Sequence, residues 1–124
     1  MFSNFVRARD LWQCQNCFRQ FLTPEQNEGR TPANLHCSHF YTRGNKSVRW
    51  DPENADAMCA MCHKYWESHR TEYEEWKLEQ LGEKAYNLLA VRAVSTGRDD
   101  EAMARLYVAK LIEELETNTN IKVP

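Results

Sequence analysis

The chain has 124 residues, a hydrophobic content of 42% and a formal net charge of −2. This length predicts one domain with a small core, and no apolar run approaches the roughly 20 residues that a membrane-spanning helix needs. No secretory signal is recognisable at the N-terminus, so we expect a reducing, bacterial cytoplasm, where cysteines are more typical of metal sites than of disulfides.

Charge is divided unevenly along the chain. Residues 1–50 contain seven Lys/Arg and three Asp/Glu, a net charge of +4, whereas residues 51–124 carry a net charge of −6. A basic surface is what a phosphate backbone requires. Many ordinary domains divide their charge as unevenly, so this feature alone is only a weak indication of nucleic-acid binding.

Two Cys-x-x-Cys pairs are the strongest chemical signal: Cys14 with Cys17, and Cys59 with Cys62. Each short pair presents two sulfurs to one ion, and four thiolates make a tetrahedral structural zinc site. We therefore predict one structural Zn²⁺ held by these four cysteines, against the alternative of a redox disulfide. Cys37 is left over and is expected to be a buried strand residue and not a ligand.

A hairpin is expected between the two cysteine pairs. After a polar, proline-containing loop over residues 23–33, we predict strands at residues 34–41 and 47–50. The turn between them contains Gly44-Asn45, which can adopt the positive φ values of a tight turn. The sequence at residues 51–54 then ends the second strand.

The last fifty residues are predicted to be helical. Thr71 and Glu74 fit a capping box at the start of a helix that ends near Leu81-Gly82, and another helix is expected over residues 83–94. A third, amphipathic helix has apolar residues at three- and four-residue spacing, which we expect mostly in the core: Met103, Leu106, Tyr107, Leu111 and Leu115. A dimer seam along residues 99–117 is the alternative.

A second metal site is predicted directly after the second cysteine pair. His63 and Glu67 are four residues apart, so they share one helix face and can converge on an ion. That face is expected to lie against the hairpin that carries His39.

This order of hairpin, Asn and helix resembles the His-Asn-His (HNH) nuclease motif, also called the ββα-metal fold, with His39, Asn54 and His63 as signature residues. The resemblance implies that His39 activates water as general base and that Asn54 holds the loop. A Mg²⁺ or Mn²⁺ ion at His63 and Glu67 would stabilise charge on the phosphate. It also implies an α+β fold, with a zinc-stapled head over residues 1–70.

The resemblance extends beyond the motif. The pattern FVRARD…CxxC…HFxTRG…VRWDxEN…CxxC, followed by EYEEW…LG, is similar to the lambda NinG (Rap) family of phage recombination proteins, over roughly residues 5–90. The family implies a structure-selective endonuclease that acts on D-loops or Holliday junctions in the bacterial host. The helical residues 71–117 would then pack on the head or form a homodimer seam, and residues 118–124 would be a frayed tail.

One position departs from the motif, because many HNH enzymes have an Asp ligand where this chain has Ser38. Glu67 and then Asp51 are the candidates to supply the missing charge. The departure favours a second hypothesis, a non-catalytic zinc module that binds branched DNA or a recombination partner. A third hypothesis is a structural protein that assembles through its acidic helices.

Basic residues of the hairpin are the expected DNA contacts. Arg43 and Arg49 can contact phosphates or the transition state, and Lys46 lies between them. His36 and His69 are expected to have no direct role.

Overall fold

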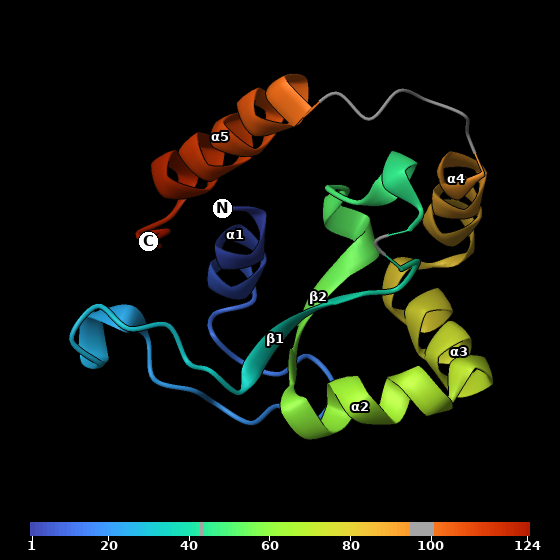
Figure 1. Ribbon diagram of the computed structural model, residues 1–124, viewed down its shortest axis with the longest axis horizontal. Coiled ribbons are helices and arrows are strands. Elements are labelled where there is room, and N and C mark those ends of the chain that lie inside the picture. The colour runs from blue at the N-terminus through green and yellow to red at the C-terminus, as the bar shows by residue number, and fades with distance from the viewer. Residues whose placement is uncertain (43, 95–100) are drawn as a thin grey trace.

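The computed structural model describes residues 1–42, 44–94 and 101–124, and it has the predicted α+β class (Figure 1). The helices and strands are α1 (Phe2–Arg9), β1 (Leu35–His39), β2 (Ala55–Cys59), α2 (Ala60–Ser68), α3 (Arg70–Leu81), α4 (Glu83–Ala93) and α5 (Glu101–Asn118). Short 3₁₀ turns are η1 (Pro24–Gln26), η2 (Lys46–Val48) and η3 (Pro52–Asn54).

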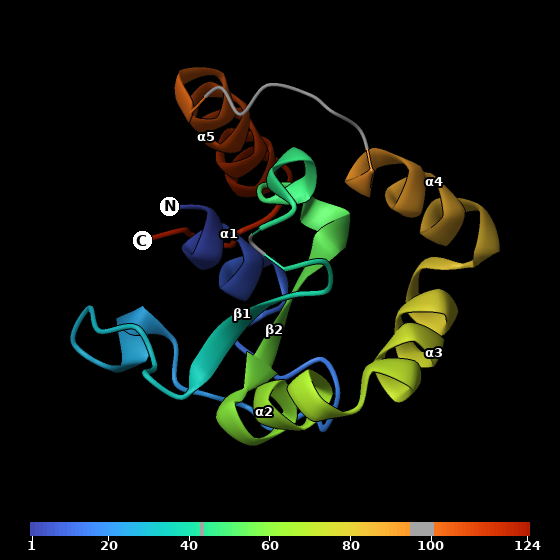
Figure 2. The ribbon, with the colours of Figure 1, turned by 45° about the vertical axis from the view of Figure 1, so that its right-hand side comes forward.

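β1 and β2 form an antiparallel ribbon that runs from Leu35 opposite Cys59 to His39 opposite Ala55. Because strand side chains alternate between faces, the ribbon packs on both sides. One face lies against α1, with α5 beyond it, and the other face lies toward α3 and α4, as Figures 1 and 2 show. The ribbon is therefore the central element around which the helices are arranged.

The second strand is not where we expected it. Residues 47–50 belong to η2 and the turn after it, and the partner of β1 is β2, directly before the second cysteine pair. All five residues of β2 are buried, so the strand lacks the alternation of polar and apolar residues that marks a half-exposed strand. Its alanines also have low strand propensity, which hides the strand further.

The end of α1 is fixed to β2 by two adjacent charged residues. The Arg9 guanidinium donates hydrogen bonds to the carbonyl oxygens of Pro52 and Ala55, both at 2.7 Å. The Asp10 carboxylate accepts a hydrogen bond from the Ala57 amide at 2.8 Å. The Arg-Asp pair seen in the sequence therefore has a structural role, which the sequence did not indicate.

A buried ion pair fixes α3 to the same strand. The Lys77 ammonium donates to the Asp56 carboxylate at 2.7 Å, and the Gln80 amide donates to its other oxygen at 2.5 Å. The Lys77 side chain is only 1% exposed. Burial lowers the pKa of Lys77, and the neighbouring Asp56 carboxylate opposes that shift.

The predicted end of one helix near Leu81-Gly82 and the start of the next at residue 83 are confirmed, but the predicted start at Thr71 is not. α3 ends at Leu81, and Gly82 follows with φ of +84°, a conformation that favours glycine. The predicted capping box is wrong: α3 begins at Arg70, one residue before Thr71, and has no side-chain cap. Glu74 instead forms an ion pair with Arg70, so local side-chain pairing replaced the expected cap.

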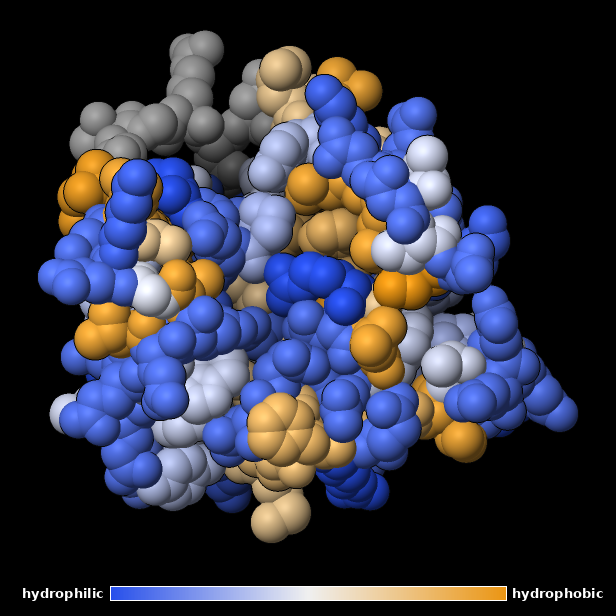
Figure 3. All heavy atoms as spheres, turned by 180° about the vertical axis from the view of Figure 1, so that it is seen from behind, coloured by the Kyte–Doolittle hydropathy of each residue, from blue (hydrophilic) through white to orange (hydrophobic). Residues whose placement is uncertain are grey.

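α5 is present as predicted, but it packs through a different face. Of the expected core residues, Leu111 and Leu115 pack against α1, whereas Met103, Leu106 and Tyr107 are 62%, 67% and 49% exposed. Figure 3, seen from behind, shows several apolar patches separated by hydrophilic side chains. The spacing therefore identified the helix correctly, but of its five expected core residues only the two in the C-terminal half are packed against the fold.

The last residues pack on the fold and do not fray. Ile121 and Val123 lie against the cluster that contains Trp12 and Leu35. The Val123 amide donates to the Glu116 carboxylate at 3.0 Å. Within the described parts of the chain, no helix is long and apolar enough to cross a membrane.

Candidate functional site

Four cysteine sulfurs meet beside the N-terminus of α2. The donor atoms of Cys14, Cys17, Cys59 and Cys62 all lie within 4.8 Å of one another. An ideal tetrahedral site with Zn–S bonds of about 2.3 Å places its sulfurs about 3.8 Å apart. Sγ of Cys17 and Sγ of Cys59 are 3.8 Å apart. The cluster can therefore hold a metal ion such as zinc, as the cysteine spacing predicted.

Local hydrogen bonds prepare these sulfurs for a cation. The side-chain amide of Asn16 donates to Sγ of Cys62 at 3.3 Å, and the backbone amide of Cys62 donates to Sγ of Cys59 at 3.4 Å. Burial raises the pKa of Cys14, but hydrogen bonds from the backbone of Cys17, Cys59 and Asn16 outweigh it and bring the pKa to about 7.

Cys62 has the opposite behaviour. Burial raises its pKa to about 12, and the nearby thiols of Cys59 and Cys14 add to this rise against the hydrogen bond from Asn16. The close thiols therefore oppose one another's ionisation unless a positive charge lies at their centre. A bound metal ion supplies that charge, and its binding displaces protons from the thiols.

Cys37 is separate from this cluster. It lies in the middle of β1, half-buried, and packs with the apolar residues of α1. It is a strand residue, as expected, and it is not part of the metal-binding group.

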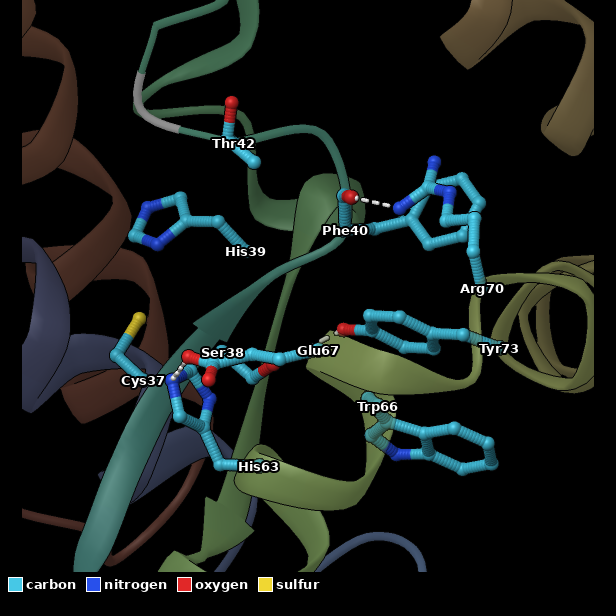
Figure 4. A pocket seen from close by; sticks show the side chains of 10 residues that line it. All are labelled: Cys37, Ser38, His39, Phe40, Thr42, His63, Trp66, Glu67, Arg70 and Tyr73. Carbon is cyan, nitrogen blue, oxygen red and sulfur yellow. Dashed lines mark hydrogen bonds and ion pairs between the residues drawn. The ribbon is translucent and has the colours of Figure 1, made fainter.

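A pocket of about 460 Å³ lies between β1 and the helices α2 and α3 (Figure 4). Its lining includes His39 from the end of β1 and both His63 and Glu67 from α2. Thus three side chains that the sequence proposed for one site line one pocket. His63 and Glu67 line it from α2, which directly follows β2, and His39 lines it from the end of β1, where its ring also lies beside Phe2 of α1.

His39 is oriented by the loop after β1. Its Nε2 is 3.0 Å from the carbonyl oxygen of Arg49. Because a carbonyl can only accept, Nε2 carries the proton in this contact, and in the neutral ring Nδ1 is then the basic nitrogen. The Phe2 ring of α1 also lies beside His39, with ring centres 6.0 Å apart. The Arg49 carbonyl therefore favours the neutral tautomer that is protonated at Nε2.

His63 and Glu67 form the pair that their spacing predicted. Nε2 of His63 is 3.3 Å from Oε1 of Glu67. Burial lowers the pKa of His63, the Glu67 carboxylate opposes this shift, and His36 adds to it. The His36 ring lies edge-on to His63 with ring centres 5.1 Å apart. A neutral imidazole beside a carboxylate is a suitable donor pair for a divalent cation.

In the part of the chain that the structure describes, no third His, Cys, Asp or Glu joins this pair in a compact group. Among the described residues, the four cysteines are the only group of three or more donors that meets within 4.8 Å. Ser38 is buried, and its hydroxyl is hydrogen-bonded to the Tyr73 hydroxyl at 3.0 Å. Asp51 is not among the described residues that line the pocket; it forms an ion pair with Arg92 at 2.6 Å and caps η3.

Asn54 holds the loop that follows His39. Its side chain is fully buried and accepts a hydrogen bond from the Tyr41 amide at 2.8 Å. It also donates to the carbonyl oxygens of Tyr41 and Val48, at 2.9 and 3.2 Å. The side chain thus links Tyr41 to Val48, which is the geometry that a loop-holding role requires.

The residues predicted to contact DNA lie outside the pocket or outside the described parts of the chain. Lys46 is exposed on η2, and the Arg49 guanidinium lies 5.4 Å from the centre of the Trp50 ring. Neither is among the described residues that line the pocket, and Arg43 lies outside the described residues. The pocket instead contains Arg70, which the sequence analysis missed because nothing in the sequence connects the start of α3 to β1.

Comparisons with known proteins do not identify the chain. No protein-family model matches it, and no match was found among curated proteins or among solved structures. The geometry of the two sites is therefore the basis for any assignment of function.

Proposed function

We propose that this protein is a divalent-metal-dependent DNA endonuclease of the HNH type. The observation that carries the proposal is the pocket that gathers His39, His63 and Glu67 beside a loop held by Asn54. The sequence resemblance to the lambda NinG family extends the proposal to branched recombination intermediates, such as D-loops and Holliday junctions. The metal at the four cysteines would be a structural Zn²⁺ that fixes the start of α2, the helix that carries His63 and Glu67.

Each residue has a defined part in this proposal. His39 takes a proton from water at Nδ1, because its Nε2 is engaged with the Arg49 carbonyl. His63 and Glu67 would hold a Mg²⁺ or Mn²⁺ ion, which retains several water molecules where the protein offers few donors. When bound, that ion supplies stabilisation of the negative charge on the phosphate and the leaving oxygen. Asn54 keeps the loop, and with it the Arg49 carbonyl, in position.

The test is cleavage of supercoiled plasmid and of synthetic four-way junctions by zinc-loaded protein with Mg²⁺, Mn²⁺ or EDTA. We expect metal-dependent cleavage that falls about 10²–10⁴-fold in His39→Ala, the usual contribution of a general base. The matched control is His69→Ala. The His69 ring stacks on Tyr65, and His69 is not among the described residues that line the pocket. Thermal melting of both variants shows whether they remain folded. A folded wild-type protein that cuts neither DNA with either metal would disprove the proposal.

A non-catalytic zinc module that binds branched DNA is the second candidate. Ser38 favours it, because its hydroxyl is buried against Tyr73 and no carboxylate occupies its position. This candidate predicts a shift of junction mobility without cleavage in every metal, and an unchanged shift in His39→Ala.

A further inference from the structure

Arg70 presents a fixed cation to the pocket from the first turn of α3. Its guanidinium carbon lies 4.1 Å from the centre of the Phe40 ring, and the Tyr41 and Tyr73 rings are also within 6 Å. Nη1 donates to the Phe40 carbonyl oxygen at 2.5 Å. In Figure 4, His39 and Arg70 lie to either side of Phe40, and the dashed line marks the bond to its carbonyl.

This fixation leaves donors for a ligand. A guanidinium has five N–H groups. One is used on Phe40, and Nε donates to Glu74 at 3.3 Å. The Arg70 side chain is 45% exposed. The remaining N–H groups are on the two Nη atoms, whose paired geometry suits two oxygens of a phosphate group.

Three other arginines near the ribbon, Arg7, Arg9 and Arg92, are used within the fold. Arg9 binds the backbone of β2, and Arg92 forms ion pairs with Asp51 and Glu53. Arg7 donates to the Leu35 carbonyl at 2.7 Å. Among the described residues that line the pocket, Arg70 is the one Lys or Arg.

The charge of the pocket also sets a condition for anion binding. Glu67 lines it, and Glu74 is paired with Arg70, so these two carboxylates oppose a phosphate. A divalent cation at His63 and Glu67 would offset one of them. Such a cation would therefore favour anion binding at Arg70.

We infer that Arg70 binds a phosphate of the DNA strand in this pocket, a role that rests on the proposed nuclease function. The stacked, hydrogen-bonded guanidinium positions the strand next to His39 without needing to order a flexible side chain on binding. Arginine suits this task better than lysine, because a planar group can both stack on Phe40 and contact two phosphate oxygens.

Anisotropy of a fluorescein-labelled four-way junction tests the inference, with zinc-loaded protein and Ca²⁺ over a range of NaCl concentrations. In Arg70→Gln we expect affinity to fall about 10-fold or more, since hydrogen bonds to charged groups contribute about 1.5–3 kcal/mol. The slope of log K against log[NaCl] should become shallower by about 0.9. Arg70→Lys should retain the slope and part of the affinity.

The matched control is Arg105→Gln, which removes an arginine from a similar i,i+4 pair with Glu101 on α5. It should change affinity less than 2-fold. Wild-type affinity and slope in Arg70→Gln, or no junction binding by the wild type, would overturn the inference. Cleavage assays keep the two proposals apart: unchanged cutting by Arg70→Gln sinks only the role of Arg70, whereas Arg70-dependent binding without cutting sinks only the nuclease.

Discussion

Replacing Asn54 by Ala should destabilise the protein by about 3 kcal/mol. The change removes the acceptor of the Tyr41 amide and the donors to the Tyr41 and Val48 carbonyl oxygens. A buried polar group left without a partner costs about 1–3 kcal/mol. We use the low end for each of the three groups, because Tyr41 is half-buried and water can reach part of this loop.

A loss of this size is a large share of the roughly 5–15 kcal/mol by which a domain is stable. The assay is urea unfolding of the zinc-loaded protein, followed by tryptophan fluorescence and fitted for both midpoint and slope. The control is Asn34→Ala, an exposed asparagine whose side chain makes no hydrogen bond to the described residues, and it should change stability by less than about 0.5 kcal/mol. An Asn54→Ala variant within 1 kcal/mol of wild type would refute the reasoning that this side chain holds the loop.

Two further predictions concern the metal and the buried ion pair. Removal of the metal by a chelator should unfold the protein and abolish its cooperative unfolding transition, because structural zinc contributes about 10–16 kcal/mol in small zinc domains. Far-UV circular dichroism and the stoichiometry of released zinc check this, and Cys37→Ser should behave as wild type. A metal-free protein that remains folded would contradict the prediction. Lys77→Met should lower the free energy of unfolding by about 3 kcal/mol or more, because the buried Asp56 carboxylate loses its ion pair with Lys77. Lys84→Met, at an exposed position, should change the free energy of unfolding little in the same urea assay. Equal stability of these two variants would show that the buried pair contributes nothing.

The features that the sequence predicted well depend on short-range geometry. The two cysteine pairs indicate a four-sulfur site because each pair closes on one ion wherever the chain between them runs. His63 and Glu67 meet because residues four apart on a helix are neighbours. The end of α3 at Gly82 likewise follows from local backbone preference.

Other features were decided by packing between segments that are distant in the sequence. β2 is buried on both faces, so its pattern carries no strand signal until α1 and α3 cover it. The buried face of α5 depends on where α1 lies, and spacing alone cannot choose between adjacent faces of a helix.

The pocket shows the same division. The sequence by itself determined that the four cysteine sulfurs and the His63–Glu67 pair meet, because local turns and one helical turn bring these side chains together. The tertiary structure alone decided that His39 and Arg70, 31 positions apart, line one cavity, since the path of the chain through β2 and α2 sets that proximity. It also directed the Ser38 hydroxyl to Tyr73, because the pleat of β1 turns that side chain toward α3.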